Sequence, residues 1–344
     1  MSRKDSCAAD RVLREATGAS FTAAAARVER HNVLLFERAY GMTRNDGNAH
    51  PVYRDTRFDL ASLTKLFVST CALEAVRDGR LSLDQTLLPW FSEWRGTAHE
   101  AITLRMLLAH TPGMDSGADY RQLLSENVVR QALMRPLVAE PAARVVYSDL
   151  SFIALGELLE RLHGVALDSI VAASFGERTG FRPRAVEREA IPATEDDGWR
   201  GRVQGVVHDE KAYLMGGVAG HAGLFASAAS VAALCERYLG ALHGRSSTFS
   251  RDLAREAVRE QASDPILRRG LGWALKTTAE NSCGRWFSNA SFGHTGFVGT
   301  CVWADPERDL CAVLLTNAVY FGRADTRDLR AAFYESLIDD LGLR

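Results

Sequence analysis

Strand-like segments at both ends of this 344-residue chain enclose a middle part that favours helices. Near the amino terminus, a polar break separates the apolar stretches FTAAAARVER and NVLLFERAYG, a pattern typical of an antiparallel hairpin. Near the carboxyl terminus, SFGHTGFVGTCVWAD and DLCAVLLTNAV flank the turn-rich PERD, and LGWALK is a further strand candidate. The sequence therefore predicts an α/β (α+β) fold whose antiparallel sheet is completed by both termini.

The middle of the chain favours helices over strands. Helix is favoured in five segments, 62–81, 104–109, 120–134, 151–162 and 227–242, and again in the last segment, TRDLRAAFYESLIDDLG, which ends at a glycine. We expect residues 1–58 and 227–344 to form a sheet lobe flanked by helices, and residues 59–226 to form a mostly helical inserted lobe. A site would lie in the cleft between the two lobes.

The charges are balanced along the chain. With 41 basic and 43 acidic residues, the formal net charge is -2, and no basic footprint for nucleic acid or an anionic membrane is visible. The first residues carry positive charges but no apolar run of signal-peptide length follows, and no other segment has membrane-spanning length. We expect a cytoplasmic protein with a small-molecule or peptide substrate. The oligomeric state stays open.

Six cysteines are scattered without CxxC pairing: Cys7, Cys71, Cys235, Cys283, Cys301 and Cys311. This spacing favours reduced, buried thiols over a disulfide framework. Cys301 and Cys311 facing each other across a hairpin is the alternative.

The stretch DLASLTKLFV places Ser62 and Lys65 three residues apart, on the same face of an expected helix. A serine becomes a nucleophile when a neighbouring base takes its proton. Lys65 would serve only if neutral, which requires roughly 4 to 5 kcal/mol to move its pKa from about 10.4 toward 7. The surrounding apolar side chains would supply part of this desolvation. Alone, this spacing is a weak signal.

Two further elements strengthen it. Tyr147-Ser148-Asp149 lies just ahead of an amphipathic helix, where Asp149 or Ser151 would otherwise be an N-cap. His294-Thr295-Gly296 lies within an expected strand, where the glycine marks a bulge or a close approach to the backbone.

In this order the three elements resemble the signatures of the serine β-lactamase and penicillin-binding-protein superfamily. The resemblance is closest to its class C and esterase-like branch, which has a tyrosine in the second element. LRMLLAHTPGMD resembles the family's leucine-rich HTSG segment. GVVHDEKAYLMGGVAGHAGLFASA is similar to a segment of family hydrolases provisionally assigned as D,D-carboxypeptidases. The likeness covers roughly residues 20–340 and does not specify the substrate.

The resemblance implies a β-lactamase/transpeptidase-like fold and an acyl-enzyme mechanism without a cofactor or metal. Ser62 would be the nucleophile, Lys65 its proton partner and Tyr147 a second acid/base group. The backbone N–H groups of Ser62 and Phe297 would form the oxyanion hole, each donor contributing about 3 to 4 kcal/mol in the transition state. The substrate would meet Asp149, His294, Thr295 and Gly296.

Two residues depart from the family pattern. His294 replaces the usual lysine, and an unperturbed histidine is mostly neutral at pH 7, so we expect esters, amides or other acyl donors without an obligatory carboxylate. Asp149 replaces the usual asparagine, and a carboxylate only accepts hydrogen bonds. It would either hold Lys65 charged, which shifts the work of the base to Tyr147, or bind an amine on the substrate.

Other polar residues receive a structural interpretation. The spacing of His208, Asp209, Glu210 and His221 fits no zinc pattern, so no metal site is expected. The glycines of the same segment, between 216 and 223, would shape a loop lining the cleft, and Trp199 lies in an expected surface loop near the substrate. His110 is expected to be a structural hydrogen-bonding residue.

Three functions are consistent with this pattern. The leading one is a serine hydrolase that cleaves an ester or amide through an acyl-Ser62 intermediate, as an esterase, peptidase or carboxypeptidase does. The alternative is an acyltransferase that passes the acyl group to an amine or alcohol. A catalytically silent binding or scaffold module of the same fold is the third.

Overall fold

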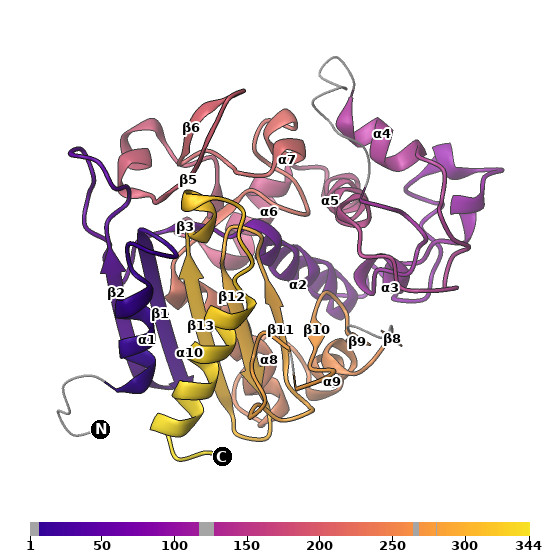
Figure 1. The fold of residues 1–344 in the computed structure, drawn as a ribbon. Coiled ribbons are helices and arrows are strands. Elements are labelled where there is room, and N and C mark those ends of the chain that lie inside the picture. The colour runs from indigo at the N-terminus through magenta and orange to yellow at the C-terminus, as the bar shows by residue number, and fades with distance from the viewer. Residues whose placement is uncertain (1–6, 117–126, 264–267, 280) are drawn as a thin grey trace.

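A computed structural model describes residues 7–116, 127–263, 268–279 and 281–344. Its main feature is an eight-stranded antiparallel sheet in the order β2-β1-β13-β12-β11-β10-β9-β8. The amino-terminal hairpin pairs with the last strand, so both ends of the chain complete the sheet, as the sequence predicts (Figure 1). The strands are β1 (Ala23–Arg30), β2 (Val33–Gly41), β8 (Ala262–Ser263), β9 (Arg268–Arg269), β10 (Ala274–Leu275), β11 (Phe292–Thr295), β12 (Cys301–Asp305) and β13 (Leu310–Thr316).

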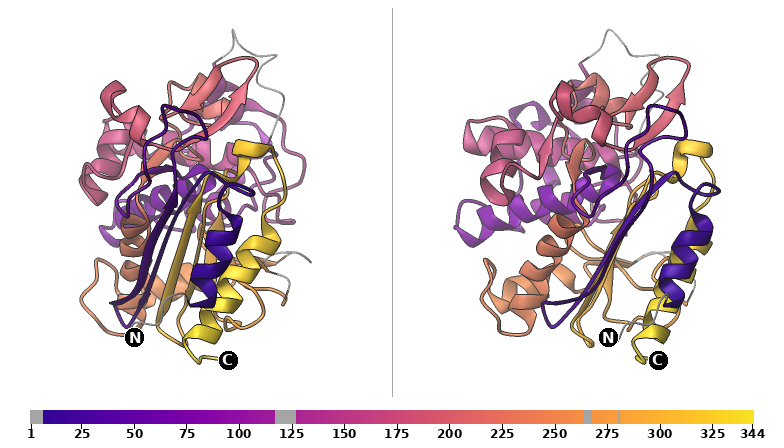
Figure 2. Two further views of the ribbon diagram at one scale, coloured as in Figure 1. Left: turned by 60° about the vertical axis from the view of Figure 1, so that its left-hand side comes forward. Right: turned by 90° about the vertical axis from the view of Figure 1, so that its left-hand side faces the viewer.

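The sheet is buried on both faces. Successive residues of a strand point to opposite faces, and in β13 Val313 and Leu314 accordingly belong to two separate apolar cores. Helices α1 (Ala8–Ala16) and α10 (Arg327–Asp340) cover one face, and α8 (Ala228–Leu242) covers the other (Figure 2). Each fully buried leucine or valine contributes about 1.5 to 3 kcal/mol, so both cores stabilise this three-layer arrangement.

The remaining elements surround α2 (Thr64–Arg77). Residues 64–73 of this helix are all buried, and it packs against α5 and α6 (Figure 1). The other helices are α3 (Leu104–Leu108), α4 (Val128–Met134), α5 (Asp149–His163), α6 (Leu167–Phe175), α7 (Glu210–Leu214) and α9 (Arg251–Val258). Two small sheets complete this part, formed by β3 (Phe58–Asp59), β7 (Leu224–Ala226) and β4 (Gly180–Phe181), and by β5 (Ala193–Asp197) and β6 (Gly201–Gln204).

Several local predictions need correction. The helix expected over 62–81 begins with a 3₁₀ turn, Ala61–Leu63, and ends at Arg77. Of the helix expected over 120–134, the structure shows α4, while residues 120–126 lie outside the described residues. The N-cap of α5 is Ser148, whose hydroxyl accepts from the Ser151 N–H at 3.2 Å, so neither Asp149 nor Ser151 fills that position. The exact lobe boundaries stay a prediction.

All six cysteines are free thiols, five of them buried and Cys7 half-buried. In the β12–β13 pairing Cys301 lies opposite Leu314 and Cys311 opposite Ala304, so these two cysteines do not face each other. Within the described ranges we find no helix whose length and apolar character would let it cross a membrane.

Candidate active site

The candidate nucleophile lies at a sharp bend. Ser62 occupies the 3₁₀ turn between β3 and α2. The preceding Ala61 has φ +46°, a backbone conformation that residues other than glycine rarely adopt. The Asp59 carboxylate fixes this bend, because it accepts from the Ala61 N–H at 2.8 Å and from the His208 N–H at 2.7 Å. Ser62 therefore belongs to a turn, although the expected proximity to Lys65 is confirmed.

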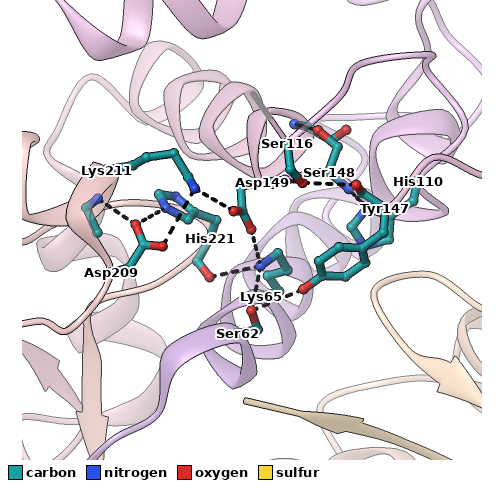
Figure 3. A network of polar contacts seen from close by, with 12 residues as sticks. Ser62, Lys65, His110, Ser116, Tyr147, Ser148, Asp149, Asp209, Lys211 and His221 are labelled. Carbon is teal, nitrogen blue, oxygen red and sulfur yellow. Dashed lines mark hydrogen bonds and ion pairs between the residues drawn. The ribbon is translucent and has the colours of Figure 1, made fainter. Parts of the chain in front are cut away.

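Lys65 is fully buried behind Ser62. Its Nζ donates to Ser62 Oγ at 3.0 Å, Asp149 Oδ1 at 2.9 Å and the His221 carbonyl oxygen at 3.2 Å (Figure 3). Burial alone would lower the pKa of Lys65, but the negative charge of Asp149 and the Tyr147 side chain outweigh it and raise the pKa. Three acceptors around three ammonium hydrogens indicate that Lys65 is charged in the resting protein, not neutral as a general base requires.

Asp149 joins two lysines. Its second oxygen, Oδ2, lies 2.9 Å from the Nζ of Lys211 on α7, and Lys211 also approaches Asp209, which binds His221 Nε2 at 2.7 Å (Figure 3). Burial alone would raise the pKa of Asp149, but Lys65, His221 and Lys211 lower it far below its usual range. We call Lys65, Asp149, Lys211, Asp209 and His221 the charge network.

Tyr147 approaches Ser62 from the other side. Its hydroxyl lies 3.1 Å from Ser62 Oγ (Figure 3). Ser116 Oγ donates to the Tyr147 carbonyl at 3.0 Å, and His110 Nδ1 accepts from the Ser148 N–H at 3.1 Å while its ring packs against the tyrosine. Burial holds the pKa of His110 well below 6.5, so this histidine is neutral and structural, as expected.

Ser62 and Tyr147 line a cavity of about 780 Å³ together with His294, Thr295, Gly296 and Phe297, which we call the strand wall. The glycine is required by close packing, because a Cβ at Gly296 would lie 2.6 Å from the Leu60 carbonyl oxygen and 2.0 Å from Thr300 Oγ1. The structure thus brings Ser62, Lys65, Tyr147 and the His-Thr-Gly strand together. Asp149 does not line this cavity but lies behind Lys65.

His294 is neutral in this setting. Burial first, and then the cations Arg269 and Lys65, lower its pKa to about 3. A neutral ring is consistent with its Nδ1, 2.8 Å from the Thr295 carbonyl oxygen, acting as a donor. Arg269 on β9 is a residue that the sequence interpretation missed. Its buried guanidinium lines the cavity and lies 5.1 Å from the centre of the Tyr147 ring, so the site does contain a permanent cation.

Lys211 and Arg269 could not be found from the sequence by any motif that we recognise. Lys211 lies within GVVHDEKAYLMGG, next to residues that attract attention as metal ligands, and Arg269 lies in a two-residue strand. Both reach the site through tertiary packing alone.

The four candidate metal ligands separate into different contacts. His208 Nε2 lies 2.8 Å from Glu195, and Glu210 lies 3.3 Å from Arg323, whereas Asp209 pairs with His221. Among the described residues, Asp149, Asp209 and His221 do come close enough to share an ion. However, the lysines of the charge network already neutralise both carboxylates.

Two other expectations about the site are wrong. Neither Trp199 nor the glycines at 216, 217, 220 and 223 are among the residues that line the cavity. Trp199 packs edge-on against Tyr213, with ring centres 5.5 Å apart. Gly220 packs against α5, where a Cβ would lie 1.9 Å from the Phe152 carbonyl oxygen. The loop contacts the site through His221, whose carbonyl oxygen accepts from Lys65 and whose ring binds Asp209.

Comparisons with known proteins identify the family of the chain. The Beta-lactamase family model matches residues 9–335. A protein of Escherichia coli O157:H7, provisionally assigned as a D-alanyl-D-alanine carboxypeptidase, is 29% identical over 92% of this chain and 83% of its own length. A relative from strain K12 with the same provisional assignment is 28% identical over 86% of this chain and 78% of its own.

Solved structures show the same fold at lower identity. EstCE1, a hydrolase with promiscuous acyltransferase activity, has a TM-score of 0.77 at 22% identity over 95% of this chain and 97% of its own. A class C beta lactamase from Rhodobacter sphaeroides has a TM-score of 0.77 at 17% identity, covering 97% of this chain and 99% of its own.

Fold and family together define a serine hydrolase with the β-lactamase/transpeptidase architecture. The chain belongs to the beta-lactamase family, whose model spans nearly its whole length.

Proposed function

We propose that this protein hydrolyses an ester or amide bond through a covalent acyl-Ser62 intermediate. One observation carries the proposal: Ser62 Oγ lies 3.0 Å from Lys65 Nζ and 3.1 Å from the Tyr147 hydroxyl, at a cavity that the strand wall also lines. In the first step, Ser62 Oγ attacks the carbonyl carbon while its proton passes to a neighbouring group. In the second step, water releases the acyl group.

The charge on Lys65 assigns the first proton transfer to Tyr147. A charged ammonium already holds its proton, and Asp149 keeps it there. Tyr147 is the other group within reach of Ser62 Oγ, and the cations of Lys65 and Arg269 each lie 5.1 Å from its ring centre. In this step Tyr147 would accept the Ser62 proton as a phenolate. The protonated tyrosine then gives this proton to the leaving group. In the second step Tyr147 takes a proton from the attacking water and passes it to Ser62 Oγ as the acyl group leaves, so that the cycle closes.

The site also bears on substrate charge. A neutral His294 argues for acyl donors without a carboxylate, whereas Arg269 offers a partner to one. Cleavage of a peptide that ends in a carboxylate, as the assignment of the E. coli relatives suggests, therefore stays within the proposal. A preference for carboxylate-bearing esters that disappears in Arg269→Met would select this substrate class, and equal turnover of both kinds of ester would select neutral donors.

Acyl transfer to an alcohol or amine is the second candidate. A cavity of about 780 Å³ has room for an acyl group and an acceptor at the same time, and hydrolysis and transfer differ only in which nucleophile resolves the intermediate. An added amine that diverts the product without changing acylation would support this alternative.

Intact-protein mass spectrometry tests the proposal. Wild-type protein, Ser62→Ala and the surface control Ser169→Ala are incubated with a panel of activated acyl esters and a β-lactam. We expect a mass gain and turnover in the wild type and the control, and neither in Ser62→Ala. No adduct and no turnover across the panel would contradict an enzymatic function and favour a silent binding module.

A further inference from the structure

The carbonyl oxygen of Gly296 is held by a buried arginine. Arg330 on α10 donates from Nη2 to the Gly296 oxygen at 2.9 Å, and the Gly299 N–H donates to the same oxygen at 3.1 Å. The Arg330 side chain is only slightly exposed, and α10 is anchored on the sheet by the buried Phe333 and Tyr334 (Figure 1). The guanidinium therefore has a fixed position relative to this carbonyl.

The same peptide unit carries the Phe297 N–H. A trans peptide is planar, and its N–H and C=O point in opposite directions, so fixing the Gly296 oxygen on Arg330 also fixes the direction of the Phe297 N–H. Within the described part of the chain, this N–H donates to no protein acceptor, and Phe297 lines the same cavity as Ser62. A donor without a protein acceptor among the described residues thus belongs to a residue that lines the cavity, and Arg330, which holds the carbonyl side of the peptide, lines this cavity as well.

A cation on the carbonyl oxygen also strengthens the donor. Hydrogen bonds in series polarise one another, and those from charged groups have the larger effect. We propose that Arg330 is a positioning residue that orients and polarises the Gly296–Phe297 peptide, so that the Phe297 N–H stabilises the negative oxygen formed when Ser62 attacks. This inference rests on the proposed acyl-Ser62 chemistry. Arg330 does not itself touch the reacting atoms in this role.

Glycine at 296 fits the same arrangement. Its N–H donates to the Thr300 carbonyl oxygen at 2.7 Å, and Arg330 also reaches this second carbonyl at 3.4 Å. The turn from Gly296 to Thr300 is therefore tied at two carbonyl oxygens to one guanidinium. Loss of the arginine would release the direction of the peptide as well as its polarisation.

The test compares transition-state and ground-state binding in wild type, Arg330→Met and Arg330→Lys. The matched control is Arg285→Met, which removes an exposed arginine that contacts Glu335 of α10 at 3.1 Å outside the cavity. For each protein we would measure kcat and KM with an activated ester, the dissociation constant of a phenylboronic acid that forms a tetrahedral adduct on Ser62, and that of the carboxylic acid product. Thermal unfolding reports whether each variant is folded.

We expect Arg330→Met to lower kcat at least about tenfold and to weaken the boronic acid by a similar factor, with KM and product binding changed less than threefold. Arg330→Lys should recover part of the loss, and Arg285→Met should match the wild type. The ratio of the two dissociation constants does not depend on the fraction of folded protein, so partial misfolding leaves the result readable.

Two results would overturn the inference. If boronic acid and product weaken equally, or if only KM rises, Arg330 is a direct substrate contact or a structural residue. If Arg330→Met behaves as the control does, the guanidinium has no effect on the peptide. Failure of the acyl-enzyme proposal is distinguishable, because wild type itself would then show neither turnover nor an adduct on Ser62.

Discussion

The two sides of the active site are built from different kinds of groups. On the helical side, the two lysines and two carboxylates of the charge network alternate, each with an opposite partner within 4 Å, and the His221 ring binds Asp209. On the sheet side, the strand wall presents a neutral imidazole, a hydroxyl and backbone groups. The difference separates proton transfer from substrate recognition: side-chain changes in the charge network should alter the proton chemistry, and side-chain changes in the strand wall should alter substrate fit. The backbone of the strand wall has a further role, because its Phe297 N–H is the proposed donor to the transition state.

The largest effect is expected for Lys65→Met. Loss of the ammonium removes a partner of Ser62 Oγ and the cation beside Tyr147, so kcat/KM should fall by at least about a thousandfold. Lys211→Met, in which Lys65 still neutralises Asp149, should lose much less. The measurement is ester hydrolysis at constant pH. Comparable losses in both variants would show that the network works as one unit and that proximity to Ser62 does not matter.

Asp149→Asn is expected to have the next largest effect. The Asp149 charge is the largest influence that raises the pKa of Lys65, so its removal should let Lys65 lose its proton at a lower pH. The alkaline limb of the pH–rate profile should therefore shift to lower pH. Activity at pH 7 should change by about tenfold. Selectivity between amine-bearing and neutral donors should not change, because Asp149 lies behind Lys65. A lost preference for amines would instead place Asp149 in contact with substrate.

His294 should make stability depend on pH. The pKa of His294 is about 3 in the folded protein and near 6.5 in the unfolded chain. Between these two pH values the His294 ring is protonated in the unfolded chain and neutral in the folded protein. Stability should therefore fall as the pH falls from 6.5 toward 3. His294→Gln should make this slope shallower by about 1.4 kcal/mol per pH unit, leaving the contribution of His110. Denaturant unfolding at several pH values measures it, and an unchanged slope would mean that His294 is protonated in the folded state.

The smallest effect is expected at the bend before the nucleophile. Ala61→Gly relieves the positive φ but loses a buried methyl group, two changes of about 1 kcal/mol each that offset one another. Stability should stay within about 1 kcal/mol of wild type. Ala72→Gly, in the interior of α2, should lose about 1 kcal/mol or more, because nothing offsets the change there. Equal losses in the two variants would indicate that the bend stores no strain.

The sequence could predict the site residues that lie in motifs, but not those that tertiary packing brings to the site. Ser62, Lys65, Tyr147 and His294 lie in short motifs whose order along the chain indicates the fold, and the structure brings them together. Arg269, Lys211 and Arg330 lie in no such motif. They reach the site from β9, α7 and α10, and such approaches depend on packing that no local pattern records.

The fold shows a similar limit. The amino-terminal hairpin and the β12–β13 pair were predictable from apolar runs and turn residues. In β13 the apolar run is continuous because this strand is buried on both faces of the sheet. Strands β8 and β9 have two residues each, too short for any periodicity, whereas the equally short β10 lies within LGWALK, the further strand candidate. The 3₁₀ turn at Ser62 was missed because apolar helical spacing continues through it. The Asp59 carboxylate that fixes the bend accepts from Ala61 in the turn and from His208, which is distant in the sequence, and no local pattern records the second contact.

The pairing of β1 with β13 has a consequence for synthesis on the ribosome. The β1–β2 hairpin is synthesised early, but its partner β13 lies nearly 300 residues later in the sequence, since Ala24 pairs with Thr316. Closing such a loop is slow compared with forming local helices. A nascent chain would thus hold its serine and lysine long before the surface that completes their catalytic surroundings exists, and acylating reagents should label it only after release.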